Sequence, residues 1–170
     1  FTGVQKRTIE KAPKNDIIKR KHKRGKLMKP VVKWAGGKTQ LLPYIREMLP
    51  TQYNNYFEPF AGGLAVLLDL KPANATINDI NPELINLYKQ LKIAYSAVMS
   101  ELDTMDIAHE SAEDCKEYYY SIRDLFNQNL NSNTPEQAAR LVYLNKHCFN
   151  GLYRVNGKGL FNVPFNNKKS

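Results

Sequence analysis

Residues 57–63 of the chain read FEPFAGG. An extended aromatic run begins before them at Tyr53, and residues 64–70 run apolar at helical length, so the pattern predicts a strand, a tight turn and a helix. Glycines in such a turn let the backbone approach a ligand closely, and the helix that follows presents backbone N–H groups at its N-terminus. The turn by itself also suits a plain packing role, in which strand and helix merely lie close together.

A second extended run, residues 75–79, ends in Asp79. Nucleotide-binding folds commonly place an acid about twenty residues after the glycine turn, against the ribose hydroxyls. Two interpretations of Asp79 stay open. In one it caps the helix that begins near Pro82; in the other Asn81 is the cap, and Asp79 faces a ligand. The two runs together favour a nucleoside-containing ligand.

Four further segments lie in order along the chain: KWAGGK at residues 33–38, NDINPEL at 78–84, NKHCFNGLYR at 145–154 and GLFNVPF at 159–165. Together with FEPFAGG they resemble the Dam-like, GATC-modifying DNA adenine methyltransferases over nearly all of residues 30–165. The resemblance implies an α/β fold: part of a Rossmann-like methyltransferase core with a helical target-recognition insert and a β-hairpin. An unrelated Rossmann-like nucleotide binder would leave KWAGGK and residues 149–154 unexplained.

The resemblance also implies S-adenosylmethionine (AdoMet) as cofactor. Trp34 matches a position that makes apolar contact with it, and Lys38 matches a cation near its carboxylate. The turn would lie under the methionine portion, and Asp79 would bind the ribose. As alternatives, Trp34 is an ordinary core aromatic and Lys38 a solvated lysine. The candidate cofactor-binding residues are Trp34, Ala35, Gly36, Lys38, Glu58, Phe60, Gly62 and Asp79.

The later segments point to DNA. Asn156-Gly157, flanked by residues 152–155 and 160–163, predicts a β-hairpin with Arg154 near its root. An arginine fork matches the two acceptors of guanine, which is also the role that the resemblance implies for Arg154. The alternative is a surface arginine beside a buried phenylalanine. The candidate DNA-binding residues are Lys33, Phe149, Asn150, Leu152, Arg154 and Asn156.

Helices are expected over residues 82–102 and 112–129, and a third begins at Thr134-Pro135 with Gln137 three residues after the capping position. They are expected to pack against the recognition hairpin. The sequence thus divides into a basic arm (1–29), the N-terminal part of an AdoMet-binding domain (30–95) and a DNA target-recognition region (96–170). The rest of the catalytic domain is expected to be absent from these residues.

The basic arm carries the whole charge excess. Residues 1–30 hold eleven Lys and Arg against two acids, and the remaining residues hold fourteen of each sign. The run KRKHKRGK at 19–26 is expected to be disordered when unbound, either as an arm that adds salt-sensitive phosphate contacts or as a linker or cloning-derived sequence. Two cysteines and no bilayer-spanning run favour a reduced, cytoplasmic protein without a metal, and the resemblance implies a bacterial or phage origin.

Catalysis in the resembling family uses an Asp-Pro-Pro-Tyr-like segment, which this sequence lacks; the nearest, Asn81-Pro82-Glu83-Leu84, has neither the second proline nor the aromatic. No catalytic residue is therefore assigned within the chain. The expected function is methyl transfer to the exocyclic amine of adenine in duplex DNA, with base flipping, in DNA methylation or restriction–modification. These residues would be an inactive fragment whose partner is the remaining half of the enzyme. The alternative is a truncated, non-catalytic DNA-binding or regulatory module.

Overall fold

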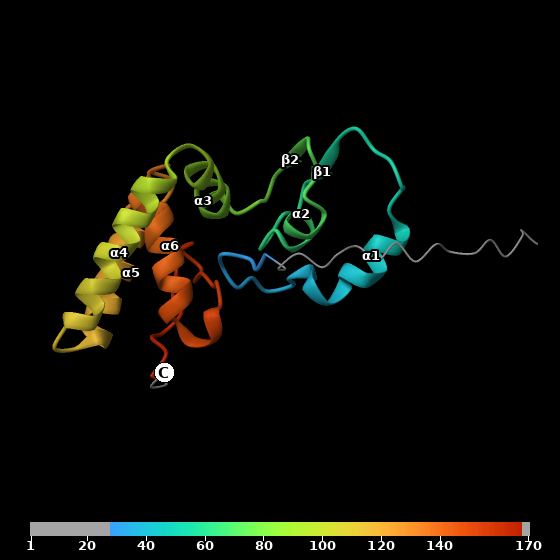
Figure 1. The fold of residues 1–170 in the computed structure, drawn as a ribbon. Coiled ribbons are helices and arrows are strands. Elements are labelled where there is room, and N and C mark those ends of the chain that lie inside the picture. The colour runs from blue at the N-terminus through green and yellow to red at the C-terminus, as the bar shows by residue number, and fades with distance from the viewer. Residues whose placement is uncertain (1–27, 168–170) are drawn as a thin grey trace, which may run out of the picture.

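The computed structural model describes residues 28–167 and arranges them in two groups (Figure 1). The predicted basic arm therefore lies outside the described residues, apart from Met28 and Lys29. One group is a small α/β unit, and the other is a bundle of four helices. The α/β elements are η1 (Lys38–Leu41), α1 (Leu42–Met48), β1 (Tyr56–Glu58), α2 (Ala65–Leu70) and β2 (Ala75–Ile77), and the later elements are α3 (Pro82–Ile93), α4 (Tyr95–Ser111), α5 (Cys115–Gln128), α6 (Pro135–His147) and η2 (Phe149–Gly151).

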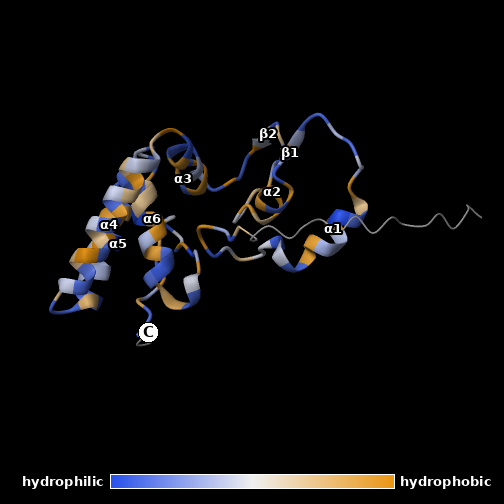
Figure 2. Ribbon diagram, in the orientation of Figure 1, coloured by the Kyte–Doolittle hydropathy of each residue, from blue (hydrophilic) through white to orange (hydrophobic). Residues whose placement is uncertain are grey.

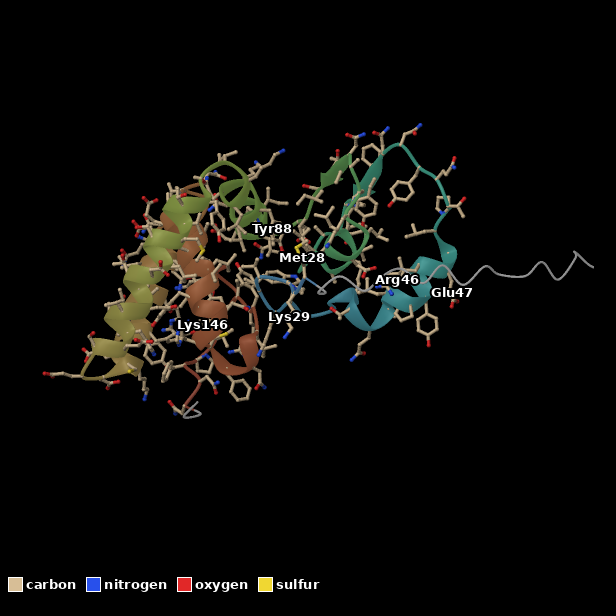
Figure 3. All side chains as sticks on the ribbon, in the orientation of Figure 1. Met28, Lys29, Arg46, Glu47, Tyr88 and Lys146 are labelled. Carbon is tan, nitrogen blue, oxygen red and sulfur yellow. The ribbon has the colours of Figure 1, made fainter. Side chains whose placement is uncertain are left out.

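The α/β unit is built on the two predicted strands. β1 and β2 pair in parallel, with Tyr56 opposite Ala75 and Glu58 opposite Ile77. A parallel pair needs a crossover, and α2 provides it. Arg46, labelled on α1 in Figure 3, pairs through both Nε and Nη2 with the carboxylate of Asp69 on α2, which ties the two helices together. The strand, turn and helix predicted around FEPFAGG are thus confirmed.

The bundle holds most of the core. α6 packs against α3, α4 and α5, and its Leu141, Tyr143 and Leu144 are almost completely buried. Apolar residues on the four helices alternate with polar ones, so each helix can bury one face while another stays in water (Figure 2). Full burial of an apolar side chain such as Leu141 or Leu144 stabilises the fold by about 1.5–3 kcal/mol relative to leaving it exposed. Val32 joins the same core from the segment that precedes the α/β unit.

The helix predicted over residues 82–102 is in fact two helices. Ala94, at φ −140° and ψ 38°, separates α3 from α4, and its N–H donates to the carbonyl of Gln90 at 2.8 Å. No glycine or proline marks this break, and the apolar spacing runs through it. Packing explains the break, because α3 and α4 both lie against α6 but run in different directions. The helices that start at Cys115 and Pro135 agree with prediction.

The C-terminal segment is fixed to the bundle by two side chains of α5. Tyr119 is fully buried and donates from its hydroxyl to the carbonyl of Val163 at 2.9 Å. Asn127 pairs with both main-chain groups of Phe161, at 2.8 and 3.0 Å. These contacts hold the predicted hairpin against a rigid helix.

Two stacked histidines in the bundle predict a loss of stability in acid. The rings of His109 and His147 lie 4.2 Å apart, and His109 Nδ1 is 2.8 Å from the hydroxyl of Tyr143. Burial lowers the pKa of both histidines, and His109 lowers that of His147 further. The unfolded chain therefore takes up protons first, so stability is full above the ordinary histidine pKa of about 6.5 and is lost as pH falls below it.

We expect the melting temperature to drop by a few degrees between about pH 7.5 and pH 5.5. The His147→Gln variant should flatten this dependence, because it removes one titrating ring and the repulsion between the two. Differential scanning calorimetry in buffers of matched ionic strength measures both. A wild-type melting temperature that is constant across this range would contradict the prediction.

Candidate cofactor and DNA site

Asp79 joins the carboxyl ends of the two strands. One carboxylate oxygen accepts the N–H of Gly62 at 2.8 Å, and the other accepts the N–H of Asn81 at 3.0 Å. Asn81 in turn is the N-cap of α3, because its side chain accepts the N–H groups of Glu83 and Leu84. The alternative in which Asp79 caps that helix is therefore excluded, and its carboxylate instead holds the glycine turn.

A tyrosine that sequence reasoning missed supports the same turn. Tyr88 extends from α3 at the junction of the bundle and the α/β unit (Figure 3), and its hydroxyl donates to the carbonyl of Gly62. Burial raises the pKa of Tyr88, and the nearby carboxylates of Asp79 and Glu58 raise it further, so the hydroxyl keeps its proton. In the sequence, Tyr88 is one of several apolar and aromatic residues at helical spacing between residues 82 and 102, and nothing local distinguishes it from them.

Residues 33–38, here called the cofactor segment, lie directly against the turn. A Cβ at Gly62, whose φ is +49°, would stand 3.3 Å from Trp34 Cδ1, so any other residue would strain the backbone and push the indole slightly away. Ala35 and Gly36 are exposed in a tight turn that the N–H of Gly37 closes on the carbonyl of Trp34 at 3.1 Å. Trp34 is partly buried, and its position beside Gly62 brings two predicted cofactor residues together.

Lys38 reaches across to Glu58 and the FEPFAGG turn. Its ammonium donates to the carbonyl of Phe60 and lies 3.5 Å from one oxygen of Glu58. The other Glu58 oxygen accepts the hydroxyl of Tyr56 at 2.8 Å. Glu58 is only 6 % exposed, whereas the Phe60 ring is 74 % exposed. Lys38 and Glu58 thus form a charged pair beside the turn, and the Phe60 side chain extends into solvent.

Residues 149–154, here called the recognition segment, present their predicted DNA-binding side chains at the surface. Phe149 is 45 % and Leu152 38 % exposed, so both apolar side chains are accessible to a ligand. Asn150 adopts a left-handed conformation with φ 56°, so the segment turns sharply between them. The N–H of Phe149 donates to the carbonyl of Pro164 at 2.8 Å, which fixes the start of the segment.

Arg154 stands at the root of the predicted hairpin. Its Nε donates to Asn162 Oδ1 at 2.8 Å and its Nη2 to the Asn162 carbonyl at 3.2 Å, so one edge of the guanidinium is held in place. Among the described residues, Nη1 makes no hydrogen bond. A bridge pairs Val155 with Phe161, and the side chain of Asn156 accepts the N–H groups of Lys158 and Leu160.

The turn of this hairpin is wider than the Asn156-Gly157 pattern predicted. The left-handed residue is Gly159, with φ +76°, and the N–H of Asn156 bonds to the carbonyl of Leu160 at 2.9 Å. The Asn156 side chain satisfies the N–H groups inside the loop, which lets a longer turn replace the two-residue one. Asn162, which orients Arg154, was also missed, although it lies within the matched segment 159–165.

A cavity of about 300 Å³ lies beside the start of α3 and the hairpin. Ile80 and Asn81, next to Asp79, form one wall, and Val155 and Gly159 of the hairpin form another. Tyr153 lines it as well, and its ring packs at a tilt of 31° against Trp34, with centroids 4.9 Å apart. The Ile80 side chain is 95 % exposed beside this space. The cavity is therefore lined by chain neighbours of Asp79 and Arg154, and by none of the predicted cofactor-binding or DNA-binding residues themselves.

Among residues 28–167, no helix is long and apolar enough to cross a membrane. Within the same residues, no group of three or more His, Cys, Asp or Glu side chains is arranged to hold a metal ion.

Comparisons with known proteins find relatives over most of the chain. The chain is 43 % identical over 145 residues to the Type II methyltransferase M1.LlaDCHI of Lactococcus lactis, covering 84 % of this chain and 49 % of that protein. It is 42 % identical over 155 residues to the Type II methyltransferase M.MjaIII of Methanocaldococcus jannaschii, covering 84 % and 54 %. It is 37 % identical over 154 residues to the DNA adenine methylase of Haemophilus influenzae, covering 90 % and 51 %.

The chain thus spans about half the length of each of these three relatives. A family model described as D12 class N6 adenine-specific DNA methyltransferase matches residues 34–170. Methyltransferases of this kind take their methyl group from AdoMet. The match includes the cofactor segment from Trp34, the glycine turn and the recognition segment, and the fold is that of a partial AdoMet methyltransferase core. The chain belongs to the D12 class of N6 adenine-specific DNA methyltransferases.

Proposed function

We propose that this chain supplies the cofactor-binding and target-recognition part of an enzyme that methylates the exocyclic amine of adenine in duplex DNA, with GATC as its site. The observation that carries the proposal is the Asp79 carboxylate, which holds the Gly62 turn at the ends of β1 and β2 beside Trp34. In open α/β sheets, ligands bind at the carboxyl ends of the strands.

The residues around the turn suit AdoMet, whose sulfonium provides an electrophilic methyl group. Asp79 offers carboxylate oxygens to ribose hydroxyls, since each of its oxygens has used one lone pair on a backbone N–H. Trp34 provides an apolar wall, and Lys38 provides a cation that is paired with the buried Glu58. The protein's task is to align the cofactor with the amine and to keep water away, which lowers the entropic part of the barrier.

The recognition segment suits a DNA major groove. Asn162 fixes the Nε edge of Arg154, so the guanidinium presents its other end without first losing rotamer freedom. The exposed rings and methyl groups of Phe149 and Leu152 can press against bases, which supports the opening of the duplex that base flipping needs. Lys33, Asn150 and Asn156 are exposed around them, available for phosphate and base edges.

The group that accepts the hydrogen bonds of the target amine is proposed to come from residues outside this chain, because the sequence contains no Asp-Pro-Pro-Tyr-like segment. That same observation favours a second candidate, a non-catalytic module that binds AdoMet and DNA without transferring methyl.

Binding and transfer assays on the same preparation test the proposal and separate the two candidates. AdoMet binding is measured by calorimetry, and transfer of labelled methyl is measured on unmethylated duplexes with and without a GATC site. Binding of AdoMet together with GATC-dependent labelling is the expected result for the enzyme. Binding of both ligands without labelling would establish the non-catalytic module. Absence of AdoMet binding would contradict both.

Arg154→Ala is expected to weaken binding to a GATC duplex by about 5–150-fold, because a bidentate contact to guanine is worth about 1–3 kcal/mol. AdoMet affinity should not change, since Arg154 bonds to Asn162 and not to the cofactor segment. Fluorescence anisotropy with GATC and altered duplexes measures both affinity and discrimination. Lys158→Ala, in the exposed hairpin turn, is the control and should weaken all duplexes alike. Equal discrimination by Arg154→Ala and wild type would refute the assignment.

A further inference from the structure

Asn145 joins the cofactor segment to the recognition segment through one side-chain amide. Its Oδ1 accepts the main-chain N–H of Lys33 at 2.8 Å, and its Nδ2 donates to the Lys33 carbonyl and to the Gly151 carbonyl, each at 2.9 Å. The residue is 6 % exposed and lies in the last turn of α6. Because the amide is planar and uses its acceptor and both donors, the three partners are held in one fixed arrangement.

The two segments are also in direct contact on either side of this amide. A Cβ at Gly151 would stand 3.1 Å from Lys33 Cβ and 3.3 Å from the Asn145 carbonyl, so the Lys33 side chain packs directly over the Gly151 backbone. The rings of Trp34 and Tyr153 pack against each other with centroids 4.9 Å apart. Neither segment can shift at this point without moving the other or breaking these contacts, since packed contacts leave little slack.

We propose that Asn145 is a positioning residue that couples DNA binding at the recognition segment to cofactor affinity at Trp34. The inference rests on the proposed function, because it assigns the two ligands to these segments. DNA that displaces the recognition segment shifts the Lys33 main chain through the amide, and Trp34, packed 3.3 Å from the Gly62 Cβ position, shifts against the glycine turn. Coupling of this kind is reciprocal, so the cofactor changes DNA affinity by the same factor.

Asn86 provides a matched control for a purely structural effect. It is 2 % exposed, donates to the Thr134 carbonyl at 3.1 Å and accepts from Gln90 at 3.2 Å. These partners lie in α3 and at the start of α6, away from both segments. Asn86→Ala should therefore lower stability about as much as Asn145→Ala, without touching the connection between the ligands.

The test uses the fluorescence of Trp34, the single tryptophan of the chain, as its readout. S-adenosylhomocysteine, which carries no transferable methyl, is titrated with and without an unmethylated GATC duplex, and the ratio of the two dissociation constants is the coupling factor. In wild type and in Asn86→Ala we expect a factor of about fivefold or more. In Asn145→Ala we expect it to fall below about twofold, with each ligand still binding alone.

Three outcomes would overturn the inference. A wild-type factor near one refutes the coupling while leaving the proposed function intact. An Asn145→Ala factor equal to that of wild type refutes the role of the amide. If the alanine variant does not fold, Asn145→Ser takes its place, because serine leaves a smaller cavity than alanine and retains a hydroxyl. Failure of wild type to bind S-adenosylhomocysteine or DNA removes the proposed function and the inference with it.

Discussion

Replacing Asp79 with alanine is expected to lower AdoMet affinity by about 100-fold or more. Hydrogen bonds to a charged group contribute about 1.5–3 kcal/mol each, and Asp79 makes two of them, to the N–H groups of Gly62 and Asn81. Their loss releases the glycine turn beside Trp34, and the carboxylate proposed to bind the ribose is lost as well. Calorimetric titration of wild type and variant measures the difference.

Asp114→Ala is the matched control for this prediction. Asp114 likewise accepts two backbone N–H groups, those of Lys116 at 2.7 Å and Glu117 at 3.1 Å, but it does so at the N-cap of α5. Its removal should cost about 1 kcal/mol of stability and leave AdoMet affinity unchanged. If both variants lost affinity to the same extent, the effect of Asp79 would be general loosening of the fold and its assignment to the cofactor would be wrong.

Gly151→Ala is expected to destabilise the chain by about 2–4 kcal/mol and to lower its melting temperature by about 6–12 °C. Gly151 has φ +65°, where an L side chain is strained, and its added Cβ would meet Lys33 Cδ at 2.5 Å and Lys33 Cβ at 3.1 Å. The clash lies between the cofactor and recognition segments, so DNA binding should be lost along with stability. Thermal unfolding and duplex binding measure the two effects.

Two other glycines separate strain from clash. Gly159 has φ +76° but nothing within 4 Å of an added Cβ, so Gly159→Ala should cost only the strain, about 1–2 kcal/mol. Gly157 has neither a positive φ nor a close neighbour, so Gly157→Ala should be nearly neutral. A melting temperature for Gly151→Ala no lower than that of Gly159→Ala would show that the Lys33 contact carries no cost.

Much of the local structure could be predicted because its causes are short-range. The Thr134-Pro135 start of α6 follows from a side chain and its neighbours, and Thr134 does accept the N–H of Gln137. Gln137 itself does not complete the expected reciprocal cap; it donates to the Phe126 carbonyl and is fully buried. Packing against α5 therefore changed the partner of a residue whose helix was correctly predicted.

In the candidate site, too, the sequence predicted some residues and missed others. Sequence placed Trp34, Glu58, Gly62 and Asp79 in one site, and the structure brings Gly62 into contact with both Trp34 and Asp79. Their roles toward AdoMet stay predictions. Sequence did not find the residues that hold them, because Tyr88 and Asn145 have the periodicity and composition of ordinary helix positions. Only their partners, far away along the chain, distinguish them.

The sequence by itself thus determined the two strands, the glycine turn, the starts of α5 and α6 and the family, since each depends on a few adjacent residues in a recognisable pattern. Only the tertiary structure decided the break at Ala94, the hydrogen bonds of Arg154 to Asn162 and those of Asn145 to Lys33. These features arise when helices compete for one buried surface and when buried polar groups must find partners. Such constraints act between residues distant in sequence, so no local pattern records them.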